Sequence, residues 1–345
     1  MFRWKPAAGT ISVAVSMPID RFQRDIDYLR ISLTDHCNLR CVYCMPLGDV
    51  PYAASEDLLD AGEIEAVVRA AASVGFRRIR FTGGEPTLRR DLVEIVERCA
   101  RVDGIRDIAM TTNGMLLPPL AEPLRDAGLN RVNIHVDSLR EDTLPEIMRR
   151  GQASTIRAGI DAAVAAGFSP IKLNCVVTRG LNDEEVGELA LLTRDHDWHV
   201  RFIELMPLGG GECAEVSRAR FVSNEDTQRR VEAALGPLES LPRFNPADES
   251  LNYRAAGAKG VIGFISPVSA PYCGTCNRMR LTADGRFHLC LLHDDEMDVR
   301  AAIRSGAGRT EIGEILLKAV GAKPTGHALE RGVEPRHRAM HHIGG

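Results

Sequence analysis

Two periodicities of hydrophobic and polar positions alternate between residues 28 and 205. Short runs that alternate with period two, or that are continuously apolar, are typical of strands, and segments with apolar residues at helical spacing follow them. The predicted strands are 28–33, 78–82, 107–112, 131–136, 172–178 and 200–205. The predicted helices are 55–72, 92–99, 120–127, 156–166 and 184–193, the first with Ser55 as its N-cap.

This serial repetition predicts an α/β fold. About six strand–helix units in series favour a parallel sheet curled into an open, incomplete β/α barrel. In such barrels ligands bind at the carboxyl ends of the strands. The motifs described below, up to Met206, are expected at these ends.

The pattern changes near residue 208. Gly209 to Gly211 predict a hinge or turn, and residues 237–248 are rich in proline and polar side chains. Segments 260–267 and 278–291 predict short antiparallel strands. We therefore expect a partial barrel over 20–207 and a smaller C-terminal domain over 208–345, packed across the open side of the barrel.

The composition indicates a globular protein and gives no sign of a nucleic-acid-binding, membrane-surface or disulfide-rich one. With 345 residues and 44% hydrophobic content the chain can build a core, and a net charge of -4 gives no indication of a nucleic-acid or membrane-surface partner. Any anion must therefore be bound by a local basic cluster. Nine cysteines, an odd number, do not suggest a disulfide framework, and residues 1–19 show neither a signal peptide nor a membrane span. A cytoplasmic location is expected.

Three cysteines follow the first predicted strand with the spacing C-x3-C-x2-C. Cys37, Cys41 and Cys44, the first cysteine triad, can hold three irons of a cubane and leave the fourth open to a ligand with an amine and a carboxylate. Zinc closed by His36 is the alternative, although His36 lies directly beside Cys37.

A second cysteine triad consists of Cys273, Cys276 and Cys290. It also offers three iron ligands, but C-x2-C is equally the spacing of a zinc knuckle, and His288 or His293 can supply a fourth ligand. The residues alone leave both metals open. The remaining cysteines are interpreted as ordinary buried or partly buried thiols: Cys99, Cys175 and Cys213.

The first cysteine triad, with Tyr43 inside it, resembles the radical S-adenosylmethionine (SAM) enzymes. The flanking segments 27–35 and 45–46 resemble one of their families, the GTP 3′,8-cyclases or molybdenum cofactor biosynthesis protein A, and the resemblance continues to the last residue. Segment 273–280, C-G-T-C-N-R-x-R, is similar to the second [4Fe-4S] site of that family, where the open iron binds the guanine of GTP. The resemblance implies two [4Fe-4S] clusters on the two triads and SAM on the first, beside Tyr43.

Further SAM contacts are implied at strand ends. Gly84 and Glu85 lie in a T-G-G-E-P motif, where glycine lets the backbone approach a ligand and the carboxylate can accept hydrogen bonds from an ammonium; a tight turn is the alternative. His135 stands where the family usually presents a serine to the SAM ribose, and imidazole can also donate, although a packing histidine is equally compatible. Met206 aligns with a methionine against adenine, or it fills the core.

The family's GTP contacts correspond to six positions, five of which are cationic. Each alone is an ordinary surface residue, but together they can supply the charge-assisted hydrogen bonds that a triphosphate needs. They are Arg30, Arg80, Thr111, Lys172, Arg278 and Arg280.

The chain ends in Gly344 and Gly345. Such an end usually frays. The resemblance implies instead a tail that reaches into the barrel and assists the chemistry, and a tail without side chains can enter a narrow channel.

The resemblance implies a radical SAM lyase, the GTP 3′,8-cyclase. A SAM-derived 5′-deoxyadenosyl radical would convert GTP to (8S)-3′,8-cyclo-7,8-dihydroguanosine 5′-triphosphate in molybdenum cofactor biosynthesis, upstream of cyclic pyranopterin monophosphate synthase. The reductant protein stays unidentified, a homodimer is allowed, and neither a nucleic acid nor a membrane is expected as a partner. The alternatives are a peptide-modifying radical SAM maturase and a non-enzymatic scaffold with two zinc sites.

Overall fold

One sheet of twelve strands connects the two halves of the chain in the computed structural model, which describes residues 17–46, 48, 50–243 and 245–344. The strand order is β12-β11-β10-β1-β2-β3-β4-β5-β6-β9-β8-β7. The six central strands are parallel and coincide with the predicted ones to within one residue at each end. They are β1 (Tyr28–Ser32), β2 (Arg78–Thr82), β3 (Asp107–Thr112), β4 (Arg131–His135), β5 (Lys172–Val177) and β6 (His199–Glu204).

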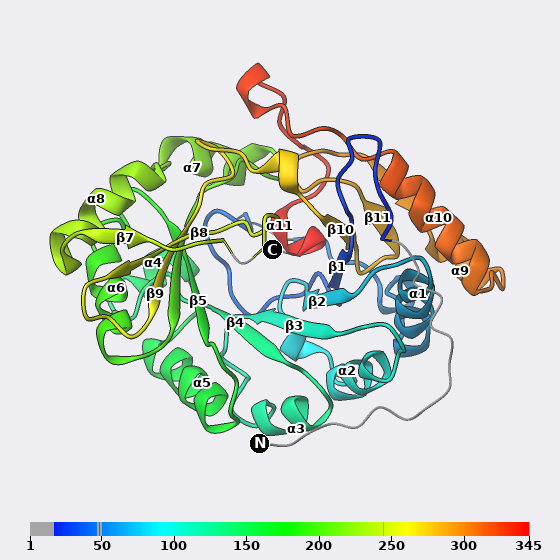
Figure 1. Cartoon of the computed structure of the whole chain (residues 1–345), viewed down its shortest axis with the longest axis horizontal. Coiled ribbons are helices and arrows are strands. Elements are labelled where there is room, and N and C mark those ends of the chain that lie inside the picture. The colour runs from blue at the N-terminus through cyan, green and yellow to red at the C-terminus, as the bar shows by residue number, and fades with distance from the viewer. Residues whose placement is uncertain (1–16, 47, 49, 244, 345) are drawn as a thin grey trace.

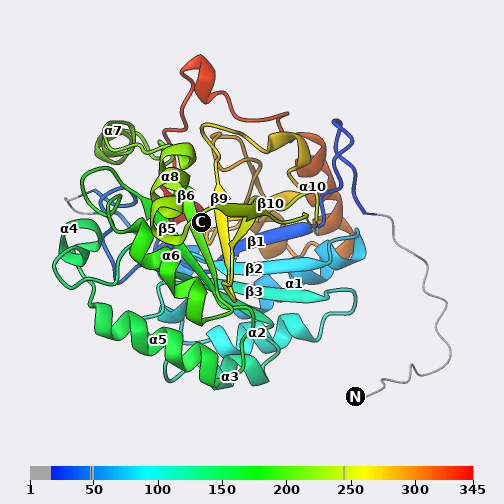
Figure 2. The same cartoon turned by 60° about the vertical axis from the view of Figure 1, so that its left-hand side comes forward.

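Helices cover the outer side of these strands (Figures 1 and 2). They are α1 (Ala61–Ser73), α2 (Leu92–Ala100), α3 (Ala121–Asp126), α4 (Leu144–Met148), α5 (Ala153–Ala165) and α6 (Val186–Asp195). The short helix α4 was not predicted, because five residues carry too little periodicity. The open parallel barrel predicted from the sequence is confirmed.

The predicted start of the first helix was wrong. Ser55 begins a separate 3₁₀ helix, Ser55–Asp57, and Asp60 is the N-cap of α1. The Asp60 carboxylate accepts a hydrogen bond from the backbone N–H of Glu63 at 2.8 Å, and the Glu63 carboxylate accepts one from Asp60 N–H at 2.9 Å. This capping box satisfies two N–H groups reciprocally, which a serine five residues earlier cannot do.

The C-terminal strands extend both edges of the barrel. β9 pairs in parallel with β6, and β10 pairs in parallel with β1, which the sequence did not predict. All five residues of β9 are buried, as in a strand with neighbours on both sides. The strands are β7 (Leu238–Ser240), β8 (Leu251–Ala255), β9 (Val261–Ile265), β10 (Arg278–Leu281), β11 (Arg286–His288) and β12 (Glu296–Asp298). The outer neighbours β8 and β11 are antiparallel, as predicted.

The helices of the C-terminal half were not predicted. They are α7 (Gly211–Ala219), α8 (Asn224–Leu235), α9 (Arg300–Arg304), α10 (Arg309–Gly321) and α11 (Met340–Ile343). The segment between α10 and α11 projects beyond the body in both views, and α11 returns to the centre of the barrel (Figures 1 and 2). The sheet continues past residue 207, and a division into two domains there stays a prediction. Within the described ranges, no helix combines the length and apolarity needed to cross a bilayer.

Strand alternation decides which residues reach the interior. In β2, Ile79 and Phe81 are fully buried in the hydrophobic core, so Arg80 and Thr82 belong to the opposite face. The same alternation in β1 places Leu29 and Ile31 in that core and leaves Arg30 on the inner face. Charged residues in the middle of buried strands therefore line the barrel.

Candidate active site

Both cysteine triads line one cavity of about 280 Å³ inside the barrel. The first triad follows β1, and the second lies just before β10 and after β11. Since β1 and β10 are neighbouring parallel strands, the first triad lies at their carboxyl ends and the second lies toward their amino ends, with the cavity between them. The resemblance implies SAM at the first triad and GTP at the second, and one cavity shared by both triads allows these two ligands to meet.

The glycine motif supports the loop of the first triad. Gly84 N–H donates to Thr34 O at 2.6 Å, and Glu85 N–H donates to His36 O at 2.7 Å. A Cβ at Gly84 would overlap the carbonyl of His36 and lie 2.7 Å from Asp35 O. Glycine is therefore required by the close approach of two backbones, in addition to its predicted contact with SAM.

We expect Gly84→Ala to lower the free energy of unfolding of the apoprotein by about 1–3 kcal/mol, because backbone atoms cannot rotate away from the added methyl group. Urea titration of the apoprotein measures this. Gly48→Ala, where a Cβ meets nothing within 4 Å, is the matched control. Equal stability of the two variants would contradict the explanation.

The spacing of the cysteine sulfurs favours clusters over single zinc ions. Within the described part of the chain, one group of three metal-ligating side chains has its ligand atoms all within 4.8 Å, namely Cys41, His135 and Asp137; neither triad forms such a group. Around one zinc ion with bonds of about 2.3 Å, thiolates lie within about 4 Å of each other. A cubane spreads its ligands over separate irons, so the residues fit a cluster better than a single ion.

The histidines considered as zinc ligands have other surroundings. His36 stacks on Tyr52 with ring centroids 4.0 Å apart, and its side chain is 51% exposed. His288 Nδ1 lies 3.1 Å from Glu296 Oε1, and His293 Nε2 lies 3.0 Å from Gly326 O. None of these three histidines lines the cavity that both triads share.

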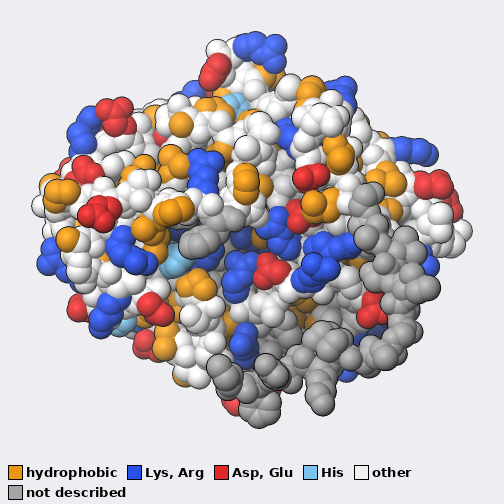
Figure 3. Space-filling model, viewed as in Figure 1, with side chains coloured by type: hydrophobic (Ala, Val, Ile, Leu, Met, Phe, Trp, Pro, Cys, Tyr) orange, Lys and Arg blue, Asp and Glu red, His pale blue; other side chains and the backbone are white. Residues whose placement is uncertain are grey.

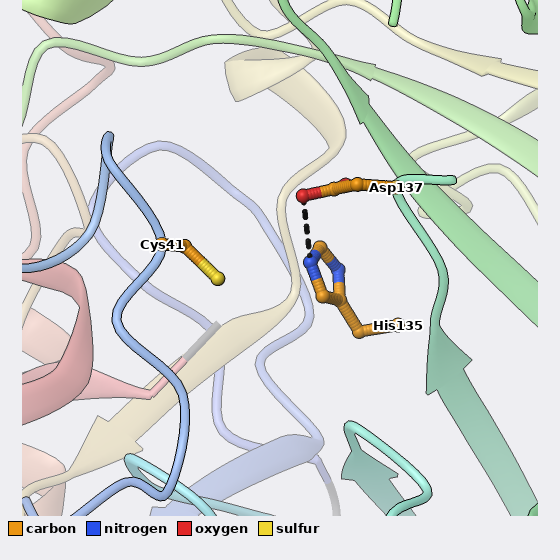
Figure 4. A group of neighbouring side chains, drawn as sticks. All are labelled: Cys41, His135 and Asp137. Carbon is orange, nitrogen blue, oxygen red and sulfur yellow. Dashed lines mark ion pairs between the residues drawn. The ribbon is translucent and has the colours of Figure 1, made fainter. Parts of the chain in front are cut away.

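Three side chains tie the first triad to the end of β4. Tyr43 Oη donates to Asp137 Oδ2 at 2.6 Å, and His135 Nε2 lies 2.9 Å from Tyr43 Oη and 3.0 Å from Asp137 Oδ2. Figure 4 shows His135 and Asp137 facing Cys41. Burial alone would lower the pKa of His135, but the charge of Asp137 and hydrogen bonds to Asp137 and Cys41 raise it well above its usual value. The imidazole is therefore held in place by charge as well as packing.

Glu85 joins β2 to β3. Its Oε1 accepts hydrogen bonds from Thr87 N, Thr87 Oγ1 and Thr112 Oγ1, and its Oε2 accepts one from Asn113 N at 2.7 Å. Burial raises the pKa of this carboxyl group. Oε2 can accept one more hydrogen bond, which leaves room for the SAM ammonium. That contact stays a prediction.

Arginines form a row across three neighbouring strands. In the sheet register Arg280 pairs with Arg30, and Arg30 pairs with Arg80. Arg278 lies two residues before Arg280 and so shares its face. All four are at most 7% exposed, and all four line the cavity. Four of the five predicted cations therefore line the cavity together with both triads, and their contact with GTP stays a prediction.

Several donors of this cluster have no protein partner. They are Arg30 Nε, Arg80 Nε and Thr111 Oγ1, which are buried within the described structure. Buried polar groups are normally paired, so unpaired donors on a cavity wall indicate a place for a polar ligand. Met206 and His135 also line this cavity.

Lys172 does not line the cavity. It is the first residue of β5, so the expectation that every motif lies at a carboxyl end was wrong for this residue. Burial lowers its pKa to about 7, and the neighbouring cations Arg201, Arg131 and Arg80 contribute. In the sheet register Lys172 pairs with Asn133 of β4, which pairs with Thr111 of β3.

Cations surround the second triad. Burial alone would raise the pKa of Cys276, but Arg278 and Lys323 lower it to about 6. Burial raises the pKa of Cys37, in the first triad, to about 12. Arg278 and Lys323 therefore stabilise the thiolate of Cys276, whereas burial raises the pKa of Cys290 in the same triad.

The C-terminal tail enters the same cavity. Met340 and His341 line it, and His341 Nδ1 lies 3.2 Å from Cys44 O. Arg280 donates a hydrogen bond to the carbonyl of Gly344. This position agrees with the prediction that the tail reaches into the barrel. Gly345 lies outside the described residues.

Sequence reasoning missed three charged residues. Arg201, 3% exposed, lies on β6 and donates through Nε to Asn174 Oδ1 at 2.9 Å; a charge inside an apolar strand was the signal available. Glu249 and Lys323 both line the cavity. They come from irregular segments, where no periodicity indicates which way a side chain points.

Two family models match successive parts of the chain. The Radical SAM superfamily model matches residues 31–193, and the Molybdenum Cofactor Synthesis C model matches residues 198–329.

Proteins named GTP 3′,8-cyclase are similar over nearly the whole chain. The protein from Moorella thermoacetica is 46% identical over 326 residues, covering 94% of this chain and 99% of the relative. The one from Pelotomaculum thermopropionicum is 45% identical over 328 residues, covering 94% and 99%. The one from Heliobacterium modesticaldum is 44% identical over 328 residues, covering 95% and 100%.

Solved structures share the fold at low identity. Streptococcus suis SuiB has a TM-score of 0.58 at 14% identity, covering 87% of this chain and 66% of SuiB. SuiB bound to S-adenosylmethionine has a TM-score of 0.55 at 14% identity, covering 84% and 67%. The family models and the relatives similar over nearly their whole length confirm the resemblance inferred from the cysteine motifs: the chain belongs to the radical SAM superfamily and, within it, to the GTP 3′,8-cyclase family.

Proposed function

We propose that this protein is a radical SAM lyase that converts GTP to (8S)-3′,8-cyclo-7,8-dihydroguanosine 5′-triphosphate in molybdenum cofactor biosynthesis. The observation that carries this proposal is the shared cavity, which has a cysteine triad on each side and a row of buried arginines between strands β10, β1 and β2. The names and full-length similarity of the relatives support it.

The cofactors are two [4Fe-4S] clusters and SAM. Cys37, Cys41 and Cys44 would hold the first cluster, and the second cysteine triad would hold the other. When bound, the first cluster supplies the electron that cleaves SAM to methionine and a 5′-deoxyadenosyl radical. The protein's own residues bind and orient the two ligands and exclude water.

Different residues of the cavity wall would bind SAM and GTP. The SAM side comprises Tyr43, Gly84, Glu85, His135 and Met206. The GTP side comprises Arg30, Arg80, Thr111, Arg278 and Arg280, together with Lys172 at the start of β5. Forked guanidinium donors suit phosphate oxygens, so the arginines would hold the triphosphate while the second cluster takes the base. The Gly344 tail, with Gly345, would close the cavity beside Arg280.

The proposal also includes the location of the protein, its partner proteins and its oligomeric state. We infer a cytoplasmic location, which the nine free cysteines support. Cyclic pyranopterin monophosphate synthase would consume the product, a reductant protein would supply electrons, and the chain can act as a homodimer.

Anaerobic incubation of the reconstituted protein with GTP, SAM and dithionite tests the function. We expect 5′-deoxyadenosine and a cyclised guanosine triphosphate in equal amounts, measured by liquid chromatography and mass spectrometry. Formation of 5′-deoxyadenosine with a peptide but not with GTP would favour a maturase. Two zinc ions and no iron after reconstitution would favour the scaffold instead.

A further inference from the structure

A carboxylate occupies the middle of the arginine row. Glu249 lies between β7 and β8, lines the cavity, and has a side chain only 12% exposed. Arg30 Nη2 donates to both of its oxygens, at 3.0 and 2.8 Å. Arg278 also donates to Glu249, and Arg80 Nη1 lies 3.8 Å from its Oε1. One carboxylate therefore contacts three of the four arginines.

This carboxylate is charged at neutral pH. Burial alone would raise the pKa of Glu249, but Arg30, Arg278 and Arg80 outweigh burial and hold the pKa well below its usual value. Basic side chains gather around the centre of this face of the molecule, with acidic groups among them (Figure 3). Glu249 partly neutralises the positive charge that an anionic ligand would encounter.

Glu249 uses the donors that a phosphate group needs. Guanidinium groups bind carboxylate and phosphate by the same forked geometry, so one Nη group cannot serve both fully. The Nε atoms of Arg30 and Arg80 stay without a protein partner, and a ligand can engage them in addition. A phosphate that enters must therefore displace the carboxylate or share its arginines with it.

We propose that Glu249 competes with phosphate groups for Arg30, Arg80 and Arg278 and so sets how tightly the cavity binds any phosphate ligand. This rests on the proposed function. The competition weakens binding of every phosphate ligand by the same factor, because each must displace the same group. Inorganic phosphates, which make no other contacts, are kept out at cellular concentrations. A nucleotide, which also gains contacts through its base and ribose, still fills the cavity.

Equilibrium dialysis of the reconstituted holoprotein tests this with four ligands: GTP, GDP, inorganic triphosphate and guanosine. In Glu249→Gln we expect the three phosphate ligands to bind tighter by a common factor of about tenfold or more, because a neutral amide no longer competes for the arginines. Guanosine, which has no phosphate, should change by less than about twofold.

Two further variants make the test decisive. Glu239→Gln, on the exposed strand β7 and outside the cavity lining, is the matched control and should change nothing. Glu249→Asp keeps the charge on a shorter side chain and should tighten phosphate binding by an intermediate factor, which covers the case that the glutamine variant does not fold. Unchanged or weaker phosphate binding in both Glu249 variants would overturn the proposal.

The outcome for the wild type separates the two proposals. If GTP binds the wild type but its affinity does not rise in either Glu249 variant, only the role of Glu249 fails. If GTP binds none of the proteins while inorganic triphosphate binds tighter to Glu249→Gln, the competition stands and the proposed function fails.

Discussion

Cys41→Ala is expected to halve the iron content after anaerobic reconstitution, from about eight to about four atoms per chain, because two thiolates cannot hold the first cluster. Formation of 5′-deoxyadenosine should fall by more than about 1000-fold, since the loss removes the step on which turnover depends. Cys41 is only 9% exposed and lies beside His135, so an external thiol cannot easily replace it. Iron and sulfide analysis and chromatography of 5′-deoxyadenosine measure both effects.

Cys99→Ala is the matched control. Cys99 is buried in α2 and is not part of the cavity lining, so this variant should retain about eight irons and its activity. Full iron content in Cys41→Ala, or equal iron loss in the two variants, would contradict the assignment of the first cluster.

Gly344→Ala is expected to lower the rate of GTP cyclisation by about 100-fold while SAM cleavage persists, because a displaced tail misplaces the groups around the substrate. A Cβ at Gly344 would overlap the Thr82 hydroxyl and lie 2.9 Å from Thr82 Cβ, and φ there is +77°. The carbonyl that accepts from Arg280 would move with the tail. Comparing cyclised product with 5′-deoxyadenosine over time measures the uncoupling.

Gly332→Ala separates backbone strain from steric overlap. Its φ is +72°, but a Cβ there meets nothing within 4 Å. We expect it to cyclise GTP at nearly the wild-type rate. An equal loss of activity in both variants would show that strain, and not the position of the tail in the cavity, explains the effect.

Much of the barrel was predictable because strand periodicity is a local property. Strands 78–82 and 107–112 were predicted with their observed bounds, since alternating or continuous apolar residues determine which side chains are buried. The N-cap of α1 was misplaced because Ser55 and Asp60 both have side chains suited to capping. Only the reciprocal bonds between Asp60 and Glu63 distinguish them.

Non-local pairing was less accessible to sequence reasoning. The burial of β9 is visible in its apolar residues, whereas β10 alternates arginine with apolar residues, and the parallel pairing of these strands with β6 and β1 depends on the path of the whole chain. Glu249 shows the same limit within the site, because its segment has no periodicity and its partners come from β1, β2 and β10. The resemblance supplied the arginines, whereas their carboxylate partner required the structure.

GTP deuterated at the 3′ carbon tests most directly whether two ligands meet in one cavity between the cysteine triads. The protein is incubated anaerobically with this substrate, unlabelled SAM and dithionite, and the 5′-deoxyadenosine is examined by mass spectrometry. We predict that deuterium passes from GTP into 5′-deoxyadenosine, because the radical formed at the first triad must reach the ribose held beside the second. Unlabelled 5′-deoxyadenosine formed together with cyclised product, the deuterium having passed from C3′ to solvent, would contradict a shared cavity for the two substrates.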